Sequence, residues 1–180
     1  MYIVVEGHDL AGKGVFINKL KTLYGRHKGE PLIVTEPYMG HPTGDAIRQF
    51  LAEKHTNSEE LYRLYRENRN YLWLDIIRPA LQQGKMVISD RNYLSSMVYQ
   101  EKMGMMNVMN HNPENIPDLL YLITTDHETY LERLKKKKGL EVIEKALAKK
   151  ENFDHLVRRY SEAAKLIDRL TRTMVINVKG

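Results

Sequence analysis

The sequence predicts a three-layer α/β/α fold around a five-stranded parallel sheet, on two observations. Short, nearly continuous runs of Val, Ile and Leu are typical of strands that are covered on both faces. Helical patterns separate these runs, and strands that alternate with helices imply crossover connections between parallel neighbours. The predicted strands span residues 2–6, 31–35, 86–90, 119–124 and 173–178.

Helical patterns fill the segments between the predicted strands. Thr56 and Glu59 have capping-box spacing at the start of the third helix, and Pro79 predicts a kink or an early end near its other terminus. The Met-rich stretch EKMGMMNVMNHN at 101–112 looks like a mobile loop, with a subunit contact as the alternative. The predicted helices span residues 13–24, 43–54, 58–83, 93–102, 127–137 and about 140–170.

The composition is that of a globular protein and excludes several classes. Apolar residues make up 42% of the 180 residues and charged residues 28%, which favours a single domain over a disordered chain. The absence of cysteine excludes disulfides, zinc-thiolate sites and thiol nucleophiles, and it fits a reducing cytoplasm. We expect no transmembrane helix, because no long apolar run occurs, and no signal peptide.

The net charge of +5 suits nucleic acid or a compact polyanion such as a nucleotide. Lysines are concentrated at 135–150, for which a solvated helical face is the alternative interpretation. Because no recognition helix or aromatic–basic RNA motif appears, we expect no nucleic-acid partner.

The segment EGHDLAGKGVF at 6–16 resembles the phosphate-binding pattern G-x-x-x-x-G-K-[ST]. It follows a predicted strand and opens a helix, the context in which backbone N–H groups and the helix dipole bind phosphate. Lys13 would reach the β- and γ-phosphates; a glycine-rich turn without this function is the alternative. The residues expected to contact ATP are Gly7, His8, Asp9, Leu10, Ala11, Gly12, Lys13, Gly14 and Val15.

Gly14 stands where the pattern has a hydroxyl that coordinates Mg²⁺. Proteins commonly hold Mg²⁺ through one or two groups, together with phosphate oxygens and water, so a water molecule can replace that hydroxyl. We therefore expect magnesium dependence to be retained but weakened.

Two further segments end strands at the same predicted edge of the sheet. Glu36-Pro37 ends the second strand and Asp90-Arg91 the third, and ligands bind at the carboxyl ends of strands in such sheets. An acid and an arginine there can organise the water shell of a metal and bind phosphate charge. A surface ion pair is the alternative for Asp90-Arg91.

In this order, the segments resemble the thymidylate kinase family of P-loop nucleoside-monophosphate kinases. EGHDLAGKG resembles the family's phosphate loop, TEP its strand-end Glu-Pro, SDRNYLSSMVYQ its Asp-Arg motif, and PDLLYLITTDHETYLERLKKK its fourth strand and following helix. The resemblance covers residues 2–178. It implies a P-loop NTPase-type fold, phosphorylation of dTMP to dTDP by ATP with Mg²⁺, and a homodimer.

The resemblance also implies roles for single residues. Asp9 matches the loop acid that meets the sugar 3′-hydroxyl, and Arg48 the arginine that holds the monophosphate. Arg91 matches the arginine between the acceptor phosphate and the transferred group, with Asp90 near the waters of the metal. The expected catalytic set is Lys13, Arg91, Asp9 and Asp90, of which Asp9 and Asp90 would contact the metal through water.

Tyr65 and Arg69 match residues that stack on thymine and contact a base carbonyl. Their i, i+4 spacing independently suits a flat apolar face beside a fixed fork of donors, while helix packing of Tyr65 is the alternative. Ser96 and Tyr99 match positions at the base edge and the 2′ side of the sugar, where Tyr99 would disfavour ribose. The expected acceptor-binding residues are Asp9, Glu36, Pro37, Tyr38, Arg48, Tyr65, Arg69, Arg91, Ser96 and Tyr99.

The lysine-rich segment at about 135–152 matches the lid that such kinases close over ATP. The family places a catalytic basic residue in the phosphate loop or in the lid, and the loop position here is the uncharged Leu10. The lid would therefore supply the charge, with Lys145, Lys149 and Lys150 as candidates among which the sequence does not choose.

Departures from the family pattern keep two other functions open. Tyr38-Met39 replaces small glycines near the acceptor pocket, which favours a kinase for a modified or different deoxynucleotide, or for a deoxynucleoside. Gly14 and the lysine-only lid favour a nucleotide-binding protein without catalysis, although the charged residues of the site are all present. Thr35 stands where an arginine often precedes Glu-Pro, and the carboxyl terminus is shorter than is usual in the family.

Overall fold

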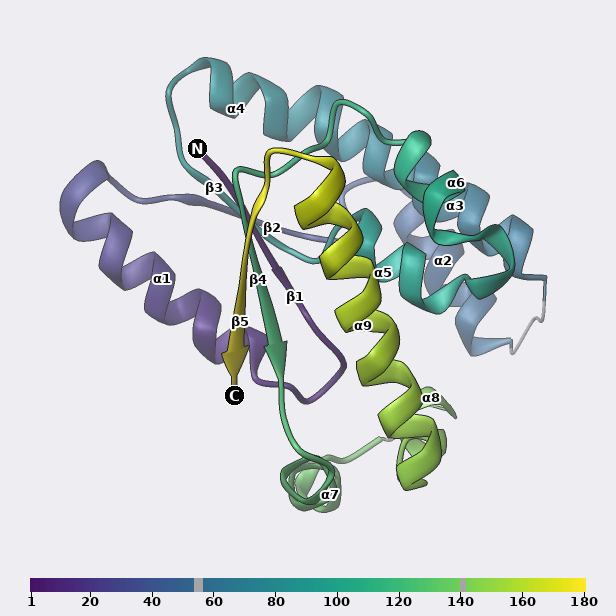
Figure 1. The fold of residues 1–180 in the computed structure, drawn as a ribbon. Coiled ribbons are helices and arrows are strands. Elements are labelled where there is room, and N and C mark those ends of the chain that lie inside the picture. The colour runs from purple at the N-terminus through teal and green to yellow at the C-terminus, as the bar shows by residue number, and fades with distance from the viewer. Residues whose placement is uncertain (54–56, 140–141) are drawn as a thin grey trace.

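The computed structural model describes residues 1–53, 57–139 and 142–180 and contains the predicted five-stranded parallel sheet (Figure 1). Its strands are β1 (Tyr2–Glu6), β2 (Leu32–Thr35), β3 (Val87–Asp90), β4 (Leu119–Thr124) and β5 (Met174–Lys179). Its longer helices are α1 (Lys13–Lys28), α2 (Pro42–Ala52), α3 (Ser58–Tyr71), α7 (His127–Lys136) and α9 (Lys150–Leu170). The shorter ones are α4 (Arg78–Gln82), α5 (Tyr93–Tyr99), α6 (Met105–Asn110) and α8 (Val142–Ala146), with a π-helical segment η1 (Leu72–Ile77) and a 3₁₀ turn η2 (Glu101–Met103).

The strand order is β2-β3-β1-β4-β5, and all four neighbouring pairs are parallel. β1 is central, and each of its residues is buried. Asp90 is in register with both Val5 and Thr35, so the carboxyl ends of β1, β2 and β3 lie level with one another. The segments that follow these three strands therefore meet at one edge of the sheet, as predicted.

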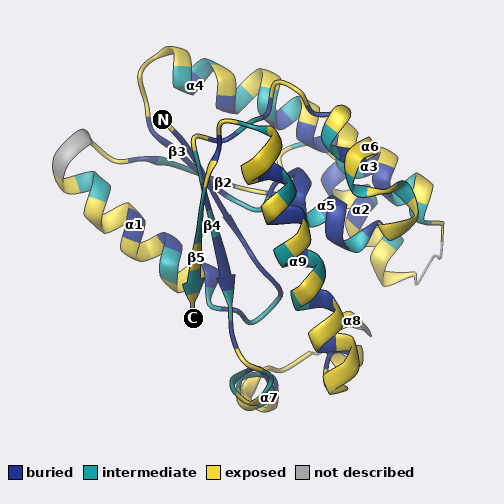
Figure 2. Ribbon diagram, viewed as in Figure 1, coloured by how far each residue is buried: buried dark blue, intermediate teal, exposed yellow. Residues whose placement is uncertain are grey.

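Alternate residues of β1 pack on opposite faces of the sheet, which produces the three predicted layers. Val5 packs with Leu20 of α1 on one face, and Val4 packs with Leu72 of η1 on the other. Residues of α5, α7 and α9 form a larger cluster on that second face. Figure 1 shows α1 on one side of the sheet with α4, α5 and α9 on the other. Figure 2 shows that the central strand β1 is buried, that the edge strand β5 is partly exposed, and that the outer faces of the helices are exposed.

The single helix predicted over 58–83 is interrupted in the structure. α3 passes into the π-helical segment η1, and α4 then begins with Pro79 in its first turn, where a missing N–H leaves no gap in the hydrogen bonding. The chain stays helical through Pro79 as far as Gln82, so the helix does not end early there, and the alternative of a kink stays a prediction. Asn57 caps α3 by accepting the N–H groups of Glu59 and Glu60 at 3.1 Å each; the predicted capping residue Thr56 lies outside the described residues.

The helix predicted over about 140–170 is divided into α8 and α9, so a continuous helix was wrong. Lys149 is extended, with φ −78° and ψ 124°. Two side chains contact the carbonyl groups before this break: His127 Nε2 lies 3.1 Å from the oxygen of Ala148, and Asn152 Nδ2 donates to that of Ala146 at 2.9 Å. These side-chain contacts replace the helical hydrogen bonds that the two carbonyl groups lose at the break. Residues 140 and 141 of the predicted helix lie outside the described residues.

The Met-rich stretch at 101–112 folds into η2 and α6, so the prediction of a loop was wrong. Gly104, with φ +71°, separates the two. Val108 is fully buried, and Met103, Met105 and Met109 pack against the cluster formed by α5, α7 and α9. Burial of these side chains supplies the order that the polar residues alone do not predict. None of the helices in the described ranges is long and apolar enough to cross a membrane.

Candidate active site

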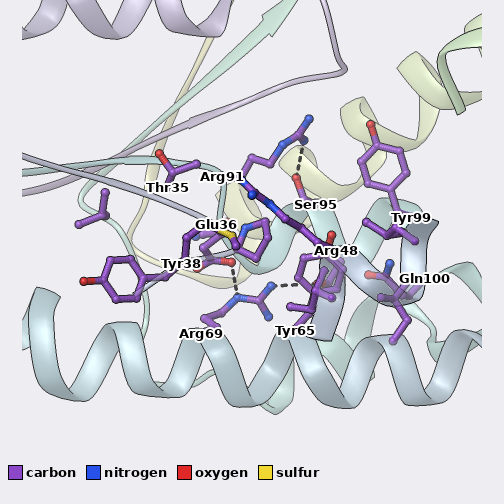
Figure 3. Close-up of a pocket in the computed structure, with 18 of the residues that line it drawn as sticks. Thr35, Glu36, Tyr38, Arg48, Tyr65, Arg69, Arg91, Ser95, Tyr99 and Gln100 are labelled. Atoms are coloured by element: carbon purple, nitrogen blue, oxygen red, sulfur yellow. Dashed lines mark hydrogen bonds and ion pairs between the residues drawn. The ribbon is translucent and has the colours of Figure 1, made fainter. Parts of the chain in front are cut away.

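A cavity of about 680 Å³ opens at the edge where β1, β2 and β3 end (Figure 3). Its walls come from the segments after these strands and from α2, α3 and α5. All the residues predicted to bind the acceptor line it: Asp9, Glu36, Pro37, Tyr38, Arg48, Tyr65, Arg69, Arg91, Ser96 and Tyr99. The fold thus gathers in one cavity residues that are far apart in the sequence.

The phosphate loop connects β1 to α1, and its backbone depends on glycine. Gly7 has a φ of +142°, and a Cβ atom there would lie 2.1 Å from the carbonyl oxygen of Ile123. Leu10 adopts φ +64°, which non-glycine residues seldom do. Arg133 of α7 donates from Nη1 to the Leu10 carbonyl at 2.8 Å. This contact ties the Leu10 part of the loop to α7.

Lys13 folds back against the loop that precedes it. Its Nζ donates to the carbonyl oxygens of Gly7 and His8, at 3.2 Å each. Burial, and after it the charge of Arg91, lower the pKa of Lys13 to about 8 against the opposing effect of Asp90 and Asp9. A bound phosphate would replace weak carbonyl acceptors with anionic oxygens, so this ammonium is placed to respond to nucleotide.

The His8 side chain points into the core. Its ring lies edge-on to Phe153 and Tyr130, with centroids 5.0 and 5.8 Å away, and its Nδ1 lies 2.7 Å from the Asp9 carbonyl oxygen. Burial lowers the pKa of this imidazole, which favours the neutral form. His8, one of the predicted ATP contacts, therefore has only its backbone groups available for such a contact.

Arg91 links the phosphate loop to the second face of the sheet. Its Nη2 donates to Asp9 Oδ1, while its Nη1 donates to Ser95 Oγ at 2.9 Å, to Tyr160 OH at 3.0 Å and to the Gly7 carbonyl at 3.2 Å. Burial alone would raise the pKa of Asp9, but Arg91 and Lys13 outweigh it, so this pKa lies below its ordinary value. A fixed cation thus stands between the loop and the cavity.

Glu36 and Arg69 form a buried ion pair in the cavity wall. Arg69 Nε donates to Glu36 Oε2 at 2.8 Å, and Arg69 Nη2 donates to Ser96 Oγ at 2.9 Å (Figure 3). Burial raises the pKa of Glu36 to about 7, although Arg69 opposes the shift. Among the described residues, Arg69 Nη1 and Glu36 Oε1 have no hydrogen-bond partner. This donor and acceptor would pair with a ligand or with water.

Tyr65, Tyr99 and Arg48 line the same cavity from three helices. Tyr65 is half-buried and lies one turn before Arg69 on α3, so both side chains point to the cavity, as Figure 3 shows. The Tyr99 ring lies edge-on to Tyr160, with centroids 6.1 Å apart. Arg48 is exposed and has no hydrogen bond or ion pair within the described part of the chain. This cation can be neutralised by an anionic ligand.

Asp90 and Asp9 offer oxygen ligands next to the phosphate loop. Both carboxylates act on the pKa of Lys13, and Asp90 Oδ1 is buried with no hydrogen-bond partner among the described residues. Hard carboxylate oxygens are what Mg²⁺ prefers. At Gly14, a Cβ atom would have no atom within 4 Å, so the missing hydroxyl leaves room for water. No group of three or more potential metal ligands occurs in the described ranges.

The three predicted lid lysines do not line the cavity. Lys145 and Lys149 are exposed, and Lys150 pairs with Asp154 at 2.7 Å. Ile143 of α8 does line the cavity, so the segment that carries these lysines borders it. Val15, the last predicted ATP contact, is exposed in the first turn of α1.

Five residues of the site carried no assigned role in the sequence. Ser95, Asn92 and Gln100 lie within the Asp-Arg motif, and the structure adds them to the cavity wall. Tyr160 of α9 reaches Arg91 from the other end of the chain, and no local pattern distinguishes it from a core tyrosine. Glu6, at the end of β1, also contacts this region; its position directly before the phosphate loop was the available signal.

Comparisons with known proteins identify the family of this chain. The family model described as thymidylate kinase matches residues 5–178. The thymidylate kinase of Desulfotalea psychrophila is 31% identical over 98% of this chain and 93% of its own length. That of Caldicellulosiruptor saccharolyticus is 34% identical over 74% of this chain and 69% of its own length. The crystal structure of thymidylate kinase from Ehrlichia chaffeensis has the same fold, with a TM-score of 0.73 at 22% identity over 98% of this chain and 91% of that one.

The matches cover nearly the whole chain. The family model spans the phosphate loop, the Glu-Pro and Asp-Arg segments and the fifth strand in a single match. The chain belongs to the thymidylate kinase family.

Proposed function

We propose that this chain transfers the γ-phosphate of ATP to dTMP, giving ADP and dTDP. The observation that carries the proposal is the Asp9–Arg91 contact, which stands where the phosphate loop meets the cavity. A cation at this junction can contact the phosphates of both substrates. Relatives named thymidylate kinase support dTMP as the acceptor.

The donor is expected to bind along residues 7–15. Backbone N–H groups of the loop and the start of α1 would hold the phosphates, and Lys13 would exchange its contacts with Gly7 and His8 for the β- and γ-phosphate oxygens. The acceptor is expected in the cavity, with its base on Tyr65 and beside Arg69 and Ser96. Arg48 would hold its phosphate, Asp9 its 3′-hydroxyl, and Tyr99 would exclude ribose.

The reaction needs no covalent intermediate. An oxygen of the dTMP phosphate attacks the γ-phosphorus of ATP, and a P–O bond forms. The bond from that phosphorus to the β,γ-bridging oxygen breaks, and its electron pair leaves with ADP. The attacking oxygen already carries a lone pair and negative charge, so no general base is required. Arg91 and Lys13 stabilise the charge that develops on the transferred group.

Mg²⁺ fits the carboxylates of Asp9 and Asp90, through water, and when bound it would neutralise charge on the phosphate oxygens. The remaining positive charge would come from the lid at 135–152, where Lys145, Lys149 and Lys150 stay the candidates. We further infer that residues 1–180 form one kinase domain, that it acts as a cytoplasmic homodimer, and that nucleic acid is not a partner.

A second acceptor class has a specific observation in its favour. The Tyr38 ring lines the cavity and stacks on Tyr71 with centroids 6.1 Å apart, so a bulky side chain borders the acceptor site. Assays with a modified or different deoxynucleotide, or with a deoxynucleoside, would test whether the acceptor site near Tyr38 suits such a substrate. A nucleotide-binding protein without catalysis would retain the cavity but would not turn over any acceptor.

A coupled assay for ADP formation, with ATP and a panel of nucleotides and nucleosides, tests these functions. We expect turnover with dTMP, equal yields of ADP and dTDP, and a loss of about 10²–10³ in kcat in Arg91→Ala, the range for removing one such stabilising donor. Turnover restricted to other acceptors would reject dTMP. Equal, negligible rates in the wild type and Arg91→Ala would instead indicate a binding protein.

A further inference from the structure

Glu6, the last residue of β1, is completely buried. An ionised carboxylate at this depth requires hydrogen-bond donors, because its removal from water is otherwise strongly unfavourable. Burial raises the pKa of Glu6, while Arg91, Asn92 and Ser95 lower it. A buried acid with this many partners has a purpose that packing alone does not explain.

Three donors from the turn after β3 converge on this carboxylate. Glu6 Oε1 accepts the backbone N–H groups of Asn92 at 2.8 Å and of Ser95 at 3.0 Å. Glu6 Oε2 accepts the hydroxyl of Ser95 at 2.7 Å and lies 4.0 Å from Arg91 Nη1. The Glu6 side chain therefore holds the turn that follows β3, the strand next to β1.

Arg91 lies within this turn and has a φ of +74°, a conformation that non-glycine residues seldom adopt and that persists only where the surroundings enforce it. Its N–H donates to the Val5 carbonyl at 3.0 Å, and its own carbonyl accepts the hydroxyl of Ser89 at 2.6 Å. The next N–H along the chain, that of Asn92, is the one bound by Glu6. Hydrogen bonds on both sides of the Arg91 Cα thus define its two backbone dihedrals.

The Arg91 guanidinium is linked to the same carboxylate. Ser95 Oγ donates to Glu6 Oε2 and accepts from Arg91 Nη1 at 2.9 Å. We propose that Glu6 is a positioning residue that holds both the backbone and the guanidinium of Arg91 for phosphoryl transfer. The proposal rests on the proposed function only in that Arg91 is taken to contact the phosphates.

The arrangement requires a carboxylate rather than an amide. Glutamine has the same shape but one acceptor oxygen and one NH₂ group. If its NH₂ faced the backbone N–H groups of Asn92 and Ser95, hydrogen-bond donors would face donors with no acceptor between them. If the NH₂ faced Ser95 Oγ, that hydroxyl would have to give its proton to Tyr160 OH, 3.4 Å away, which would disturb the contacts around Arg91. Either orientation loosens Arg91.

The test is a double-mutant cycle with Glu6→Gln and Arg91→Ala, measured by ADP formation with ATP and dTMP. We expect Glu6→Gln to lower kcat by about tenfold to hundredfold, the range for a misplaced catalytic group, with less than a roughly threefold change in KM for ATP. In the Arg91→Ala background, Glu6→Gln should lower kcat by less than about twofold. An equal fold-loss in both backgrounds, or no loss in either, would overturn the proposal.

Two further variants keep the test decisive. Ser95→Ala breaks the side-chain relay but leaves the backbone N–H bonds, so it should give a smaller loss that also disappears in Arg91→Ala; it decides the matter if Glu6→Gln does not fold. Asp118→Asn is the matched control, because its Oδ2 accepts the Tyr2 N–H at 2.7 Å at the other end of β1. We expect unchanged kcat there.

A crystal structure of Glu6→Gln separates this inference from the proposed function. We expect Arg91 to leave the positive-φ region or to lose its contacts with Ser95 and Asp9. Retention of both would overturn the positioning role whatever the enzyme turns over. Absence of dTMP turnover in the wild type would reject only the function.

Discussion

The substitution Gly14→Ser tests whether the missing hydroxyl weakens the use of magnesium. A Cβ atom at Gly14 would meet no atom within 4 Å, so serine fits without rearrangement. Gly14 lies in the first turn of α1 and is exposed. Replacing glycine in a helix stabilises it by roughly 0.5–1 kcal/mol, which corresponds to about 1–4 °C in Tm for a chain of this size. The hydroxyl should add a direct metal ligand beyond this effect.

The assay is the initial rate against free Mg²⁺ at saturating ATP and dTMP. We expect half-saturation at about threefold to tenfold lower Mg²⁺ in Gly14→Ser, equivalent to roughly 0.6–1.4 kcal/mol for one added ligand. Gly14→Ala is the matched control, since it carries at least as large a gain in helix stability without the hydroxyl. An unchanged magnesium dependence in Gly14→Ser, or an equal change in both variants, would refute the reasoning.

Three further predictions follow from burial around the site. The pKa of Lys13 is lowered from 10.5 to about 8, so between these pH values the native state binds fewer protons than the unfolded state. This group therefore makes the ligand-free protein more stable as pH rises through that range. Binding of ATP near pH 8 should take up protons, which calorimetry in buffers of different ionisation enthalpy measures. The pKa of Glu36 is raised from 4.5 to about 7, so its stabilising contribution is complete below pH 4.5 and lost as pH rises through 7. In urea denaturation, the free energy of unfolding of the wild type should fall between pH 5 and pH 8 through this group, and Glu36→Gln should lack this contribution. Gly7→Ala should lower the free energy of unfolding by at least about 3 kcal/mol, since its Cβ would lie 2.1 Å from a carbonyl oxygen, whereas Gly25→Ala, with open space around its Cβ in α1, should raise it slightly.

The sheet and the cavity were predictable because local patterns carry them. Apolar runs marked all five strands, and their alternation with helices gave parallel pairing. Once the strands are parallel, their carboxyl ends must share an edge, so Gly7, Glu36 and Arg91 were expected together before any side chain was placed. The i, i+4 spacing of Tyr65 and Arg69 likewise defined a shared face, and the structure directs that face into the cavity.

The features that the sequence did not predict depend on contacts between distant segments. The break between α8 and α9 is accompanied by the contact of His127 with the Ala148 carbonyl, and nothing in the local pattern at 146–150 specifies a partner on α7. The order of the Met-rich stretch comes from burial of Val108 among residues of other helices. Tyr160 contacts Arg91 across 69 positions of sequence. Propensity and periodicity describe a segment alone, whereas these effects belong to the packed molecule.

The ligand-free arrangement of Arg91 bears on how the site distinguishes binding from catalysis. Its guanidinium is already held by Ser95, Tyr160 and the Gly7 carbonyl, and its charge is partly balanced by Asp9. A donor that is fixed before the substrates arrive needs no reorganisation when charge develops on the transferred phosphoryl group, which is the condition under which electrostatic stabilisation lowers the barrier most. Arg48, by contrast, is exposed and without a partner among the described residues, so an acceptor phosphate must order it. Removal of Arg48 should therefore act mainly on KM for the acceptor, while removal of Arg91, or of the carboxylate that holds it, should act mainly on kcat.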